Sequence, residues 1–241
     1  MPSIIKSLFF TLLITASFSA SAQESGQFNE EDYTVENVFG INKGTNGGII
    51  SGFYFRQSKF VSEGNLTNYG IEIVNIKHVR ETKETTITGS SFVFGKSNYL
   101  IAIRPTYGRE KILFKKAPQQ GARITGMVAA GPSIGVEVPY FLELNGSRKE
   151  QYNPDDPSHA RNFIVGTAGP FRGLGRSKFV LGGHAKASLT FETNAAKKKV
   201  FGAEVGVSLD IYARKINILP ESANSSSFVA GFVAIYFGRR R

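Results

Sequence analysis

The stretch that decides the fold class is Phe179-Val-Leu-Gly-Gly-His-Ala-Lys-Ala-Ser-Leu-Thr-Phe191. Its odd positions read Phe, Leu, Gly, Ala, Ala, Leu, Phe, and its even positions read Val, Gly, His, Lys, Ser, Thr. A period of two places each set on its own face of an extended strand. The segment therefore predicts a β-strand with one apolar face and one face of small and polar residues.

Two further segments repeat this alternation. From Phe201 to Ile211 the odd positions are apolar, while the even ones include Glu204, Ser208 and Asp210. From Ile124 to Leu142 every even position is apolar or Gly. The polar faces hold mostly Gly, Ser and Ala with an occasional charge, which suits the narrow interior of an eight-stranded barrel. We therefore predict that Phe201, Val205, Val207, Leu209 and Ile211 point out of the barrel.

Several of the segments are long enough to cross a membrane, which takes about 9–11 tilted residues. The predicted fold is an all-β, up-and-down antiparallel transmembrane β-barrel of eight strands, an even number as in bacterial single-chain barrels. The predicted strands are 49–60, 67–80, 98–106, 110–117, 122–143, 178–192, 199–213 and 226–238.

The N-terminus has the features of an export signal. Lys6 precedes the short apolar run Leu8–Ile14, and Ala20 and Ala22 fit the A-x-A pattern of a signal peptidase site. We predict a signal peptide over 1–22 cleaved after Ala22, a polar periplasmic lead-in over 23–48 and a barrel domain over 49–241. The chain has no cysteine, so no disulfide supports the fold.

The closing segment, Ser227-Phe-Val-Ala-Gly-Phe-Val-Ala-Ile-Tyr-Phe237, resembles the last strand of outer-membrane proteins, although three arginines follow it. In size and strand count the chain resembles the small eight-stranded outer-membrane barrels of the OmpA and OmpX type. Phrases such as Tyr107-Gly108-Arg109 and Gly131-Pro132-Ser133 are similar to those of other Gram-negative outer-membrane barrels. The resemblance implies a bacterial outer-membrane location and assigns no functional residue.

Charged residues on the polar faces are the candidate lumen residues. We expect them to pair with one another and plug the barrel, because an unpaired charge in a low-dielectric interior is costly; selection of an ion is the alternative. This lumen charge network comprises Arg123, Glu137, His184, Lys186, Glu204 and Asp210.

Cationic residues gather where the predicted strands end, and the chain has a formal net charge of +10. If the N-terminus is periplasmic, all of them face the periplasm as a cationic rim. Such a rim would contact outer-membrane lipid phosphates or an acidic periplasmic partner; nucleic acid is not an expected partner. The rim comprises Lys77, Arg80, Lys115, Lys116, Lys197, Lys198, Lys199, Arg239, Arg240 and Arg241.

No segment carries recognisable chemistry. The three histidines His78, His159 and His184 lack the spacing of metal ligands, and we predict no catalytic residue, no cofactor and no metal. The long connection 145–177 is predicted to be extracellular, with a short helix that begins after Asp156 and continues to about Val165. The predicted function is a non-enzymatic structural or interaction barrel. The alternatives are a lipid-modifying membrane enzyme and a soluble periplasmic barrel with an apolar interior.

Overall fold

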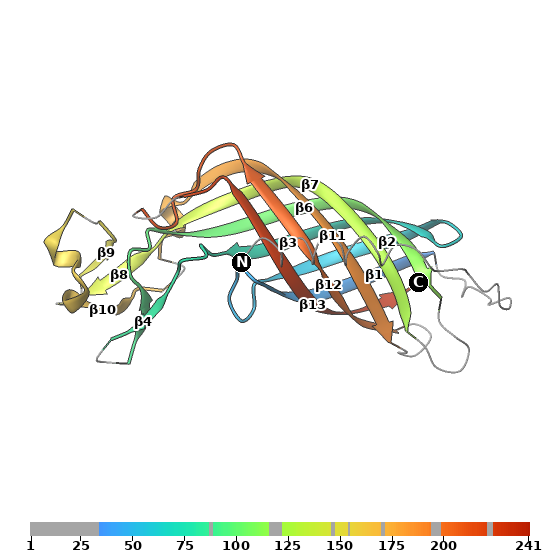
Figure 1. Cartoon of the computed structure of the whole chain (residues 1–241), viewed down its shortest axis with the longest axis horizontal. Helices are drawn as coiled ribbons and strands as arrows, with labels where there is room; N and C mark the ends of the chain where they lie inside the picture. The colour runs from blue at the N-terminus through green and yellow to red at the C-terminus, as the bar shows by residue number, and fades with distance from the viewer. Residues whose placement is uncertain are drawn as a thin grey trace, which may run out of the picture. The chain divides into compact units, whose positions relative to one another are not determined.

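The structure is a computed structural model that describes residues 34–86, 89–115, 122–145, 148–153, 155–169, 172–193, 199–220 and 224–241. Eight antiparallel strands close into a barrel in the order β1-β13-β12-β11-β7-β6-β3-β2 (Figure 1). Apart from the seam between β1 and β13, neighbours in the barrel are neighbours along the chain. The predicted fold class, an all-β up-and-down barrel of eight strands, is confirmed. The barrel strands are β1 (Val35–Gly44), β2 (Gly52–Ser62), β3 (Asn65–Ile76), β6 (Asn98–Phe114), β7 (Arg123–Pro139), β11 (Lys178–Thr193), β12 (Lys199–Tyr212) and β13 (Ser227–Arg240).

The first strand corrects the predicted domain boundary. β1 lies inside the segment 23–48 that was predicted to be an irregular lead-in, and it pairs with both β2 and β13. Its outward residues Phe39 and Ile41 alternate with Gly40 and Asn42, a signal too short to stand out against the polar residues around it. The signal peptide and residues 23–33 lie outside the described residues.

A second correction keeps the strand count at eight. The predicted strands 98–106 and 110–117 are one strand, β6, which pairs with β3 without interruption from Asn65↔Lys111 to Ile76↔Leu100. The sequence prediction ended one strand at Thr106 and began the next at Glu110, which left Tyr107-Gly108-Arg109 between them. Gly108 lies within the strand. Glycine is required at this position because a Cβ there would lie 2.5 Å from the Val128 carbonyl oxygen.

These two corrections reverse the predicted end of the barrel for every connection before β6, whereas the connection between β6 and β7 stays at its predicted end. We call the end with the connections 63–64, 115–122 and 194–198 the short-turn end. The opposite end, with the connections 45–51, 77–97, 140–177 and 213–226, is the loop end. The segment 77–97, which was predicted to lie with the short turns, belongs to the loop end.

Ordered structure extends beyond the barrel at the loop end, on the left of Figure 1. Chain leaving β7 forms a three-stranded sheet, and the connection between β3 and β6 forms a hairpin. Aromatic and aliphatic side chains from both, including Phe92, Tyr140 and Ile164, make a separate buried cluster. The three-stranded sheet consists of β8 (Phe141–Leu144), β9 (Lys149–Gln151) and β10 (Ile164–Thr167). The hairpin consists of β4 (Lys83–Thr85) and β5 (Ser91–Val93).

The helix predicted after Asp156 forms only in part. The Asp156 side chain accepts a hydrogen bond from the Ser158 amide, as expected for an N-cap. The turn ends after one 3-10 turn, Pro157–His159, and a second covers Arg161–Phe163. Ile164–Thr167 is strand β10, so the predicted continuation to about Val165 is wrong. Pairing with β8 in the three-stranded sheet takes the place of helix growth. Among the described residues, no helix is long and apolar enough to cross a membrane.

The barrel interior accommodates large rings over glycines. Gly202 of β12 faces inward opposite Tyr236 of β13, and a Cβ at Gly202 would lie 2.5 Å from the Tyr236 Cζ atom and 2.4 Å from the Phe191 carbonyl oxygen. Gly40 and Tyr54 form the same arrangement between β1 and β2. Glycine is therefore required at these positions by close approach.

We expect Gly202→Val to lower the free energy of unfolding by about 1–3 kcal/mol, because the added side chain overpacks the interior. Urea titration of the barrel refolded in phosphatidylcholine vesicles measures this value. The matched control is Ala203→Val, one residue along on the outer face, where a β-branched side chain meets no crowded interior and stability should be preserved. Equal losses for both variants would contradict the packing argument.

Candidate functional site: the charged lumen and the apolar exterior

The two faces of the barrel differ sharply in charge. The eight barrel strands contain seven carboxylates, and every one is on the inner face and at most 5% exposed. The outer face of the same strands carries cations but no carboxylate. The seven are Glu36, Glu72, Glu110, Glu137, Glu192, Glu204 and Asp210.

The centre of the lumen holds a network around Glu204. Arg56 donates to Glu204 at 3.0 Å and lies 3.4 Å from Glu110, and Lys186 lies 3.4 Å from Glu204. The Tyr54 hydroxyl donates to the same carboxylate at 3.1 Å, and the Ser188 hydroxyl does so at 2.9 Å. The predicted pairing of Lys186 with Glu204 is therefore present, joined by cations and hydroxyls that the sequence reading did not single out.

Towards the loop end the network continues around Glu72 and Asp210. Arg104 donates to Asp210 through Nε at 2.9 Å and lies 3.6 Å from Glu72, which also accepts from Lys186. The His184 imidazole lies 3.4 Å from Asp210 and 3.9 Å from Glu72, without hydrogen-bond geometry to either. Predicted lumen residues His184, Lys186, Glu204 and Asp210 thus belong to one connected network.

The other two predicted lumen residues lie at the two ends. Arg123 contacts Glu36 at 3.0 Å and Glu192 at 2.8 Å at the short-turn end, where Arg240 bridges the same two carboxylates. Glu137 lies at the loop end and accepts from Arg214 at 2.6 Å. Arg123 and Glu137 therefore lie at opposite ends of the barrel, in ion pairs separate from those around Glu204.

The loop-end mouth of the barrel is filled by apolar side chains. Ile216, Ile218 and Leu219, from the connection between β12 and β13, pack against Val74 and Leu100 of the barrel wall. Towards the loop end of the interior, a cavity of about 20 Å³ lies among residues that include Ser51, Glu72 and Lys186. A cavity of this size holds about one water molecule.

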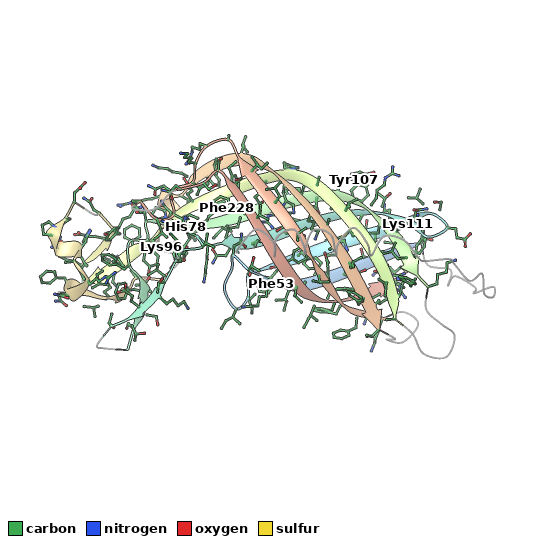
Figure 2. The ribbon with its side chains drawn as sticks, viewed as in Figure 1. Phe53, His78, Lys96, Tyr107, Lys111 and Phe228 are labelled. Carbon is green, nitrogen blue, oxygen red and sulfur yellow. The ribbon has the colours of Figure 1, made fainter. Side chains whose placement is uncertain are left out.

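The outer face is apolar over most of its height. The facing predicted for β12 is confirmed, since Phe201, Val205, Val207 and Ile211 are 43–57% exposed while Glu204, Ser208 and Asp210 are buried. Leu209, on the same outward row, is half-buried. Phe53 and Tyr107 project from the same outer surface on other strands (Figure 2). An apolar outside around a charged inside is the arrangement of a barrel that spans a bilayer, and it excludes the alternative of a soluble barrel with an apolar interior.

The structure divides the predicted cationic rim. Lys199, Arg239 and Arg241 are exposed at the short-turn end, and Lys115 pairs there with Glu63 at 2.8 Å. Arg240 points inward and belongs to the lumen. Lys77 and Arg80 follow β3 at the loop end, so their assignment to the rim is wrong. Lys116, Lys197 and Lys198 lie outside the described residues.

The sequence reading missed other outer-face cations and inner-face charges. Lys59, Arg109 and Lys111 are exposed near the short-turn end, and Lys111 is labelled in Figure 2. Glu72 lies between the outward residues Ile71 and Ile73, so the alternation that identified β12 could have found it. Arg56 lies between Phe55 and the polar Gln57, where the alternation is weaker. Glu36 was missed because β1 was missed.

The histidines do not form a hydrolytic site in the part of the chain that is described. Both ring nitrogens of His184 have no hydrogen-bond partner. His159 contacts the Asn153 backbone through Nδ1 and Glu150 through Nε2. His78 accepts a hydrogen bond from the Arg80 amide.

One grouping of possible metal ligands lies outside the barrel. Ligand atoms of Glu150, Asp156 and His159 lie within 4.8 Å of one another at the loop end. Arg148 donates to Glu150, and Ser158 donates to Asp156, so both carboxylates already have protein partners. These hydrogen bonds lower the pKa of both carboxyl groups, with the largest contribution in each case from the Arg148 or Ser158 side chain.

We expect Glu204→Gln to lower the free energy of unfolding by about 3 kcal/mol. This is the low end for a broken buried ion pair, because Arg56 and Lys186 each keep a second carboxylate. Urea titration in phosphatidylcholine vesicles measures the loss. Adding Lys186→Met to this variant should recover part of the lost free energy of unfolding, because it removes the buried ammonium group that has lost Glu204 as a partner.

The matched control for this experiment is Glu63→Gln, which breaks the exposed pair with Lys115 at the short-turn end. Exposed ion pairs contribute little to stability, so this variant should unfold like the parent protein. A Glu204→Gln barrel as stable as the parent would contradict the role assigned to the central network.

Comparisons with known proteins find similarity only among solved structures. No family model and no curated protein matches the chain. Two structures of Ail, the attachment invasion locus protein of Yersinia pestis, align with TM-scores of 0.39 and 0.38 at 10% and 9% identity, over 86% of this chain and 97% of Ail. In one of them Ail is in complex with the heparin analogue sucrose octasulfate.

A structure of Neisserial surface protein A (NspA) aligns with a TM-score of 0.35 at 6% identity, over 87% of this chain and 97% of NspA. At these values the likeness carries no argument about function. The assignment of the chain as a bilayer-spanning, eight-stranded antiparallel β-barrel therefore rests on its own strand register and on the charge of its two faces.

Proposed function

We propose that this protein is a non-enzymatic outer-membrane β-barrel of a Gram-negative bacterium, with a closed lumen and an interaction role carried by its loop end. The observation that supports this most directly is the lumen itself, in which the barrel carboxylates contact cations from several strands. A pore needs a continuous water path. Here ion pairs, tyrosines and an apolar cluster fill successive levels of the interior.

The orientation in this proposal follows from the connections. The short-turn end faces the periplasm and the loop end faces the outside, as in bacterial barrels with short periplasmic turns and longer extracellular loops. The loop end is also the end where the chain builds ordered structure beyond the barrel, with its own buried cluster. A folded surface of this kind suits contact with a partner. Export would use the signal peptide 1–22.

Lys96 illustrates how firmly that loop structure is built. Its ammonium group is buried and lies 2.7 Å from Glu81 and 4.7 Å from the centre of the Tyr99 ring. Removal from water lowers the pKa of Lys96, against the opposing effect of Glu81. The pair of Glu81 with Lys96 therefore joins the two ends of the segment that carries the hairpin β4–β5, next to Tyr99 at the start of β6.

We expect the purified protein to give no steady ohmic conductance in a planar bilayer, because ion pairs, tyrosines and apolar side chains occupy successive levels of the interior. Heat-modifiable migration on a gel must first show that the inserted protein is folded, so that a silent bilayer is informative. Steady conductance from folded protein would overturn the closed lumen. Failure to show a heat-modifiable form in any membrane or detergent would contradict the outer-membrane barrel.

The orientation can be measured directly because the chain has no cysteine. We expect Arg148→Cys, at an exposed loop-end site, to react with a membrane-impermeant maleimide on intact cells. Glu63→Cys, at an exposed short-turn site, should react only after the outer membrane is permeabilised. The opposite pattern would show that the barrel is inserted the other way round.

A further inference from the structure

The outer face of four adjacent strands is arranged in rows at the short-turn end. The strand register aligns Asn37, Arg239 and Lys199 across β1, β13 and β12. Two residues further into the membrane-facing wall, it aligns four phenylalanines on β2, β1, β13 and β12. These are Phe55, Phe39, Phe237 and Phe201.

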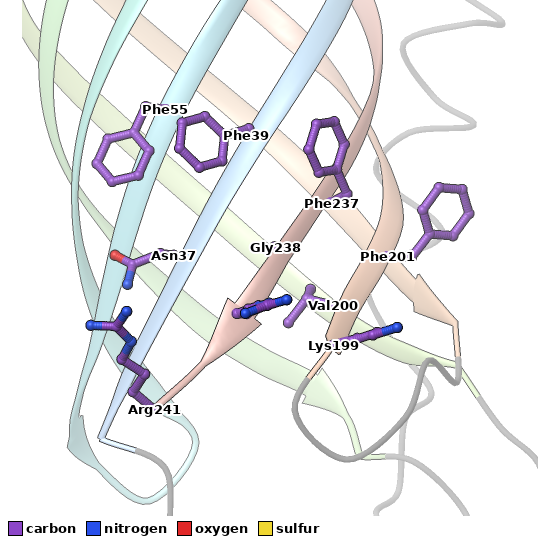
Figure 3. A pocket seen from close by; sticks show the side chains of 10 residues that line it. Asn37, Phe39, Phe55, Lys199, Val200, Phe201, Phe237, Gly238 and Arg241 are labelled. Carbon is purple, nitrogen blue, oxygen red and sulfur yellow. The ribbon is translucent and has the colours of Figure 1, made fainter.

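The phenylalanine row and the cations line one groove. Figure 3 shows the four rings at a similar level, with Lys199 and Arg241 nearer the end of the barrel. The groove has a volume of about 700 Å³ and is bounded by the four rings and by Lys199, Arg239 and Arg241. The ring centres of Phe39 and Phe55 are 4.9 Å apart, and those of Phe39 and Phe237 are 6.3 Å apart. The surface therefore has a row of aromatic rings, of which Phe55, Phe39 and Phe237 are in contact, with cations along one edge.

Charge on this face is of one sign. The carboxylates of β12, β13, β1 and β2 are Glu204, Asp210 and Glu36, and all three are buried in the lumen. Among the described residues, no carboxylate forms an ion pair with Lys199, Arg239 or Arg241. Three cations at the edge of an apolar groove complement a ligand that joins an anionic group to a hydrocarbon chain.

We propose that this groove is a binding site for an anionic glycerophospholipid of the periplasmic leaflet. The phosphate contacts Lys199, Arg239 and Arg241, and an acyl chain lies along the rings of Phe39, Phe237 and Phe201. This inference rests on the proposed function, since it requires the short-turn end to lie at a bilayer surface. A soluble acidic protein would use the cations but not the row of rings directly above them.

The cations of the groove differ from the other exposed cations near the short-turn end. Lys59, Arg109 and Lys111 are exposed near the same end but do not line the groove. If all these cations acted only as a diffuse positive field, any two of them would contribute alike to lipid binding. A bound lipid instead requires the cations that border the rings. This difference makes the proposal testable with charge-matched variants.

The experiment uses the absence of tryptophan from the chain. Phe201→Trp places a single fluorescent reporter in the groove of the full-length barrel, reconstituted in phosphatidylcholine. Brominated phosphatidylglycerol and brominated phosphatidylcholine are then compared as quenchers, which gives a relative binding constant for the anionic lipid. We expect this constant to exceed one. In Lys199→Gln/Arg239→Gln it should fall towards one, by about fivefold for each cation removed at low salt.

The charge-matched control is Lys59→Gln/Arg109→Gln, which should keep the preference of the parent. An equal fall in the control would replace the site with a diffuse field and overturn the proposal. Equal quenching by both lipids in the parent would also overturn it and assign the cations to a soluble acidic partner. No quenching by either lipid would show that the groove is outside a bilayer, and would overturn the membrane-spanning assignment as well.

Discussion

The structure depends on the placement of every barrel carboxylate inside a narrow lumen. Burying a charge is costly unless it is paired, and the cost of leaving one unpaired exceeds the gain from most single contacts. Each inward carboxylate therefore needs a cation from another strand, as Glu204 has in Arg56 and Lys186. These contacts join residues far apart in the chain and hold strands on opposite sides of the barrel at a common level.

The filling of the lumen follows from the same constraint. Ionic and hydroxyl groups occupy the centre, and large rings occupy the space beside inward glycines, as with Tyr236 over Gly202. Apolar side chains such as Ile216 and Ile218 then close the loop-end mouth. Among the described residues, the interior is thus occupied by ionic groups at its centre and by rings and aliphatic side chains beside them.

The outer wall is the counterpart of this interior. With the carboxylates inside, the outward cations of the strands have no acidic neighbour on their own face. They gather at the ends of the strands, with aromatic rings next to them on β12, β13 and β1. This order, apolar wall then rings then cations, matches the depth profile of a bilayer from hydrocarbon to phosphate.

The sequence by itself determined the class of fold and the face on which each residue of a long strand lies, because a period of two is a local property of extended chain. It therefore identified the outward row of β12 and the inward Glu204 and Asp210. It did not determine that Val35–Gly44 belongs to the barrel, because the alternation there is short and the strand is held by its pairing with β2 and β13. Because that strand was not predicted, Lys77 and Arg80 were assigned to the wrong end of the barrel. Only the tertiary structure decided which charges meet, such as Arg123 with Glu36 and Glu137 with Arg214, because those distances depend on closure of the sheet and on cross-strand register.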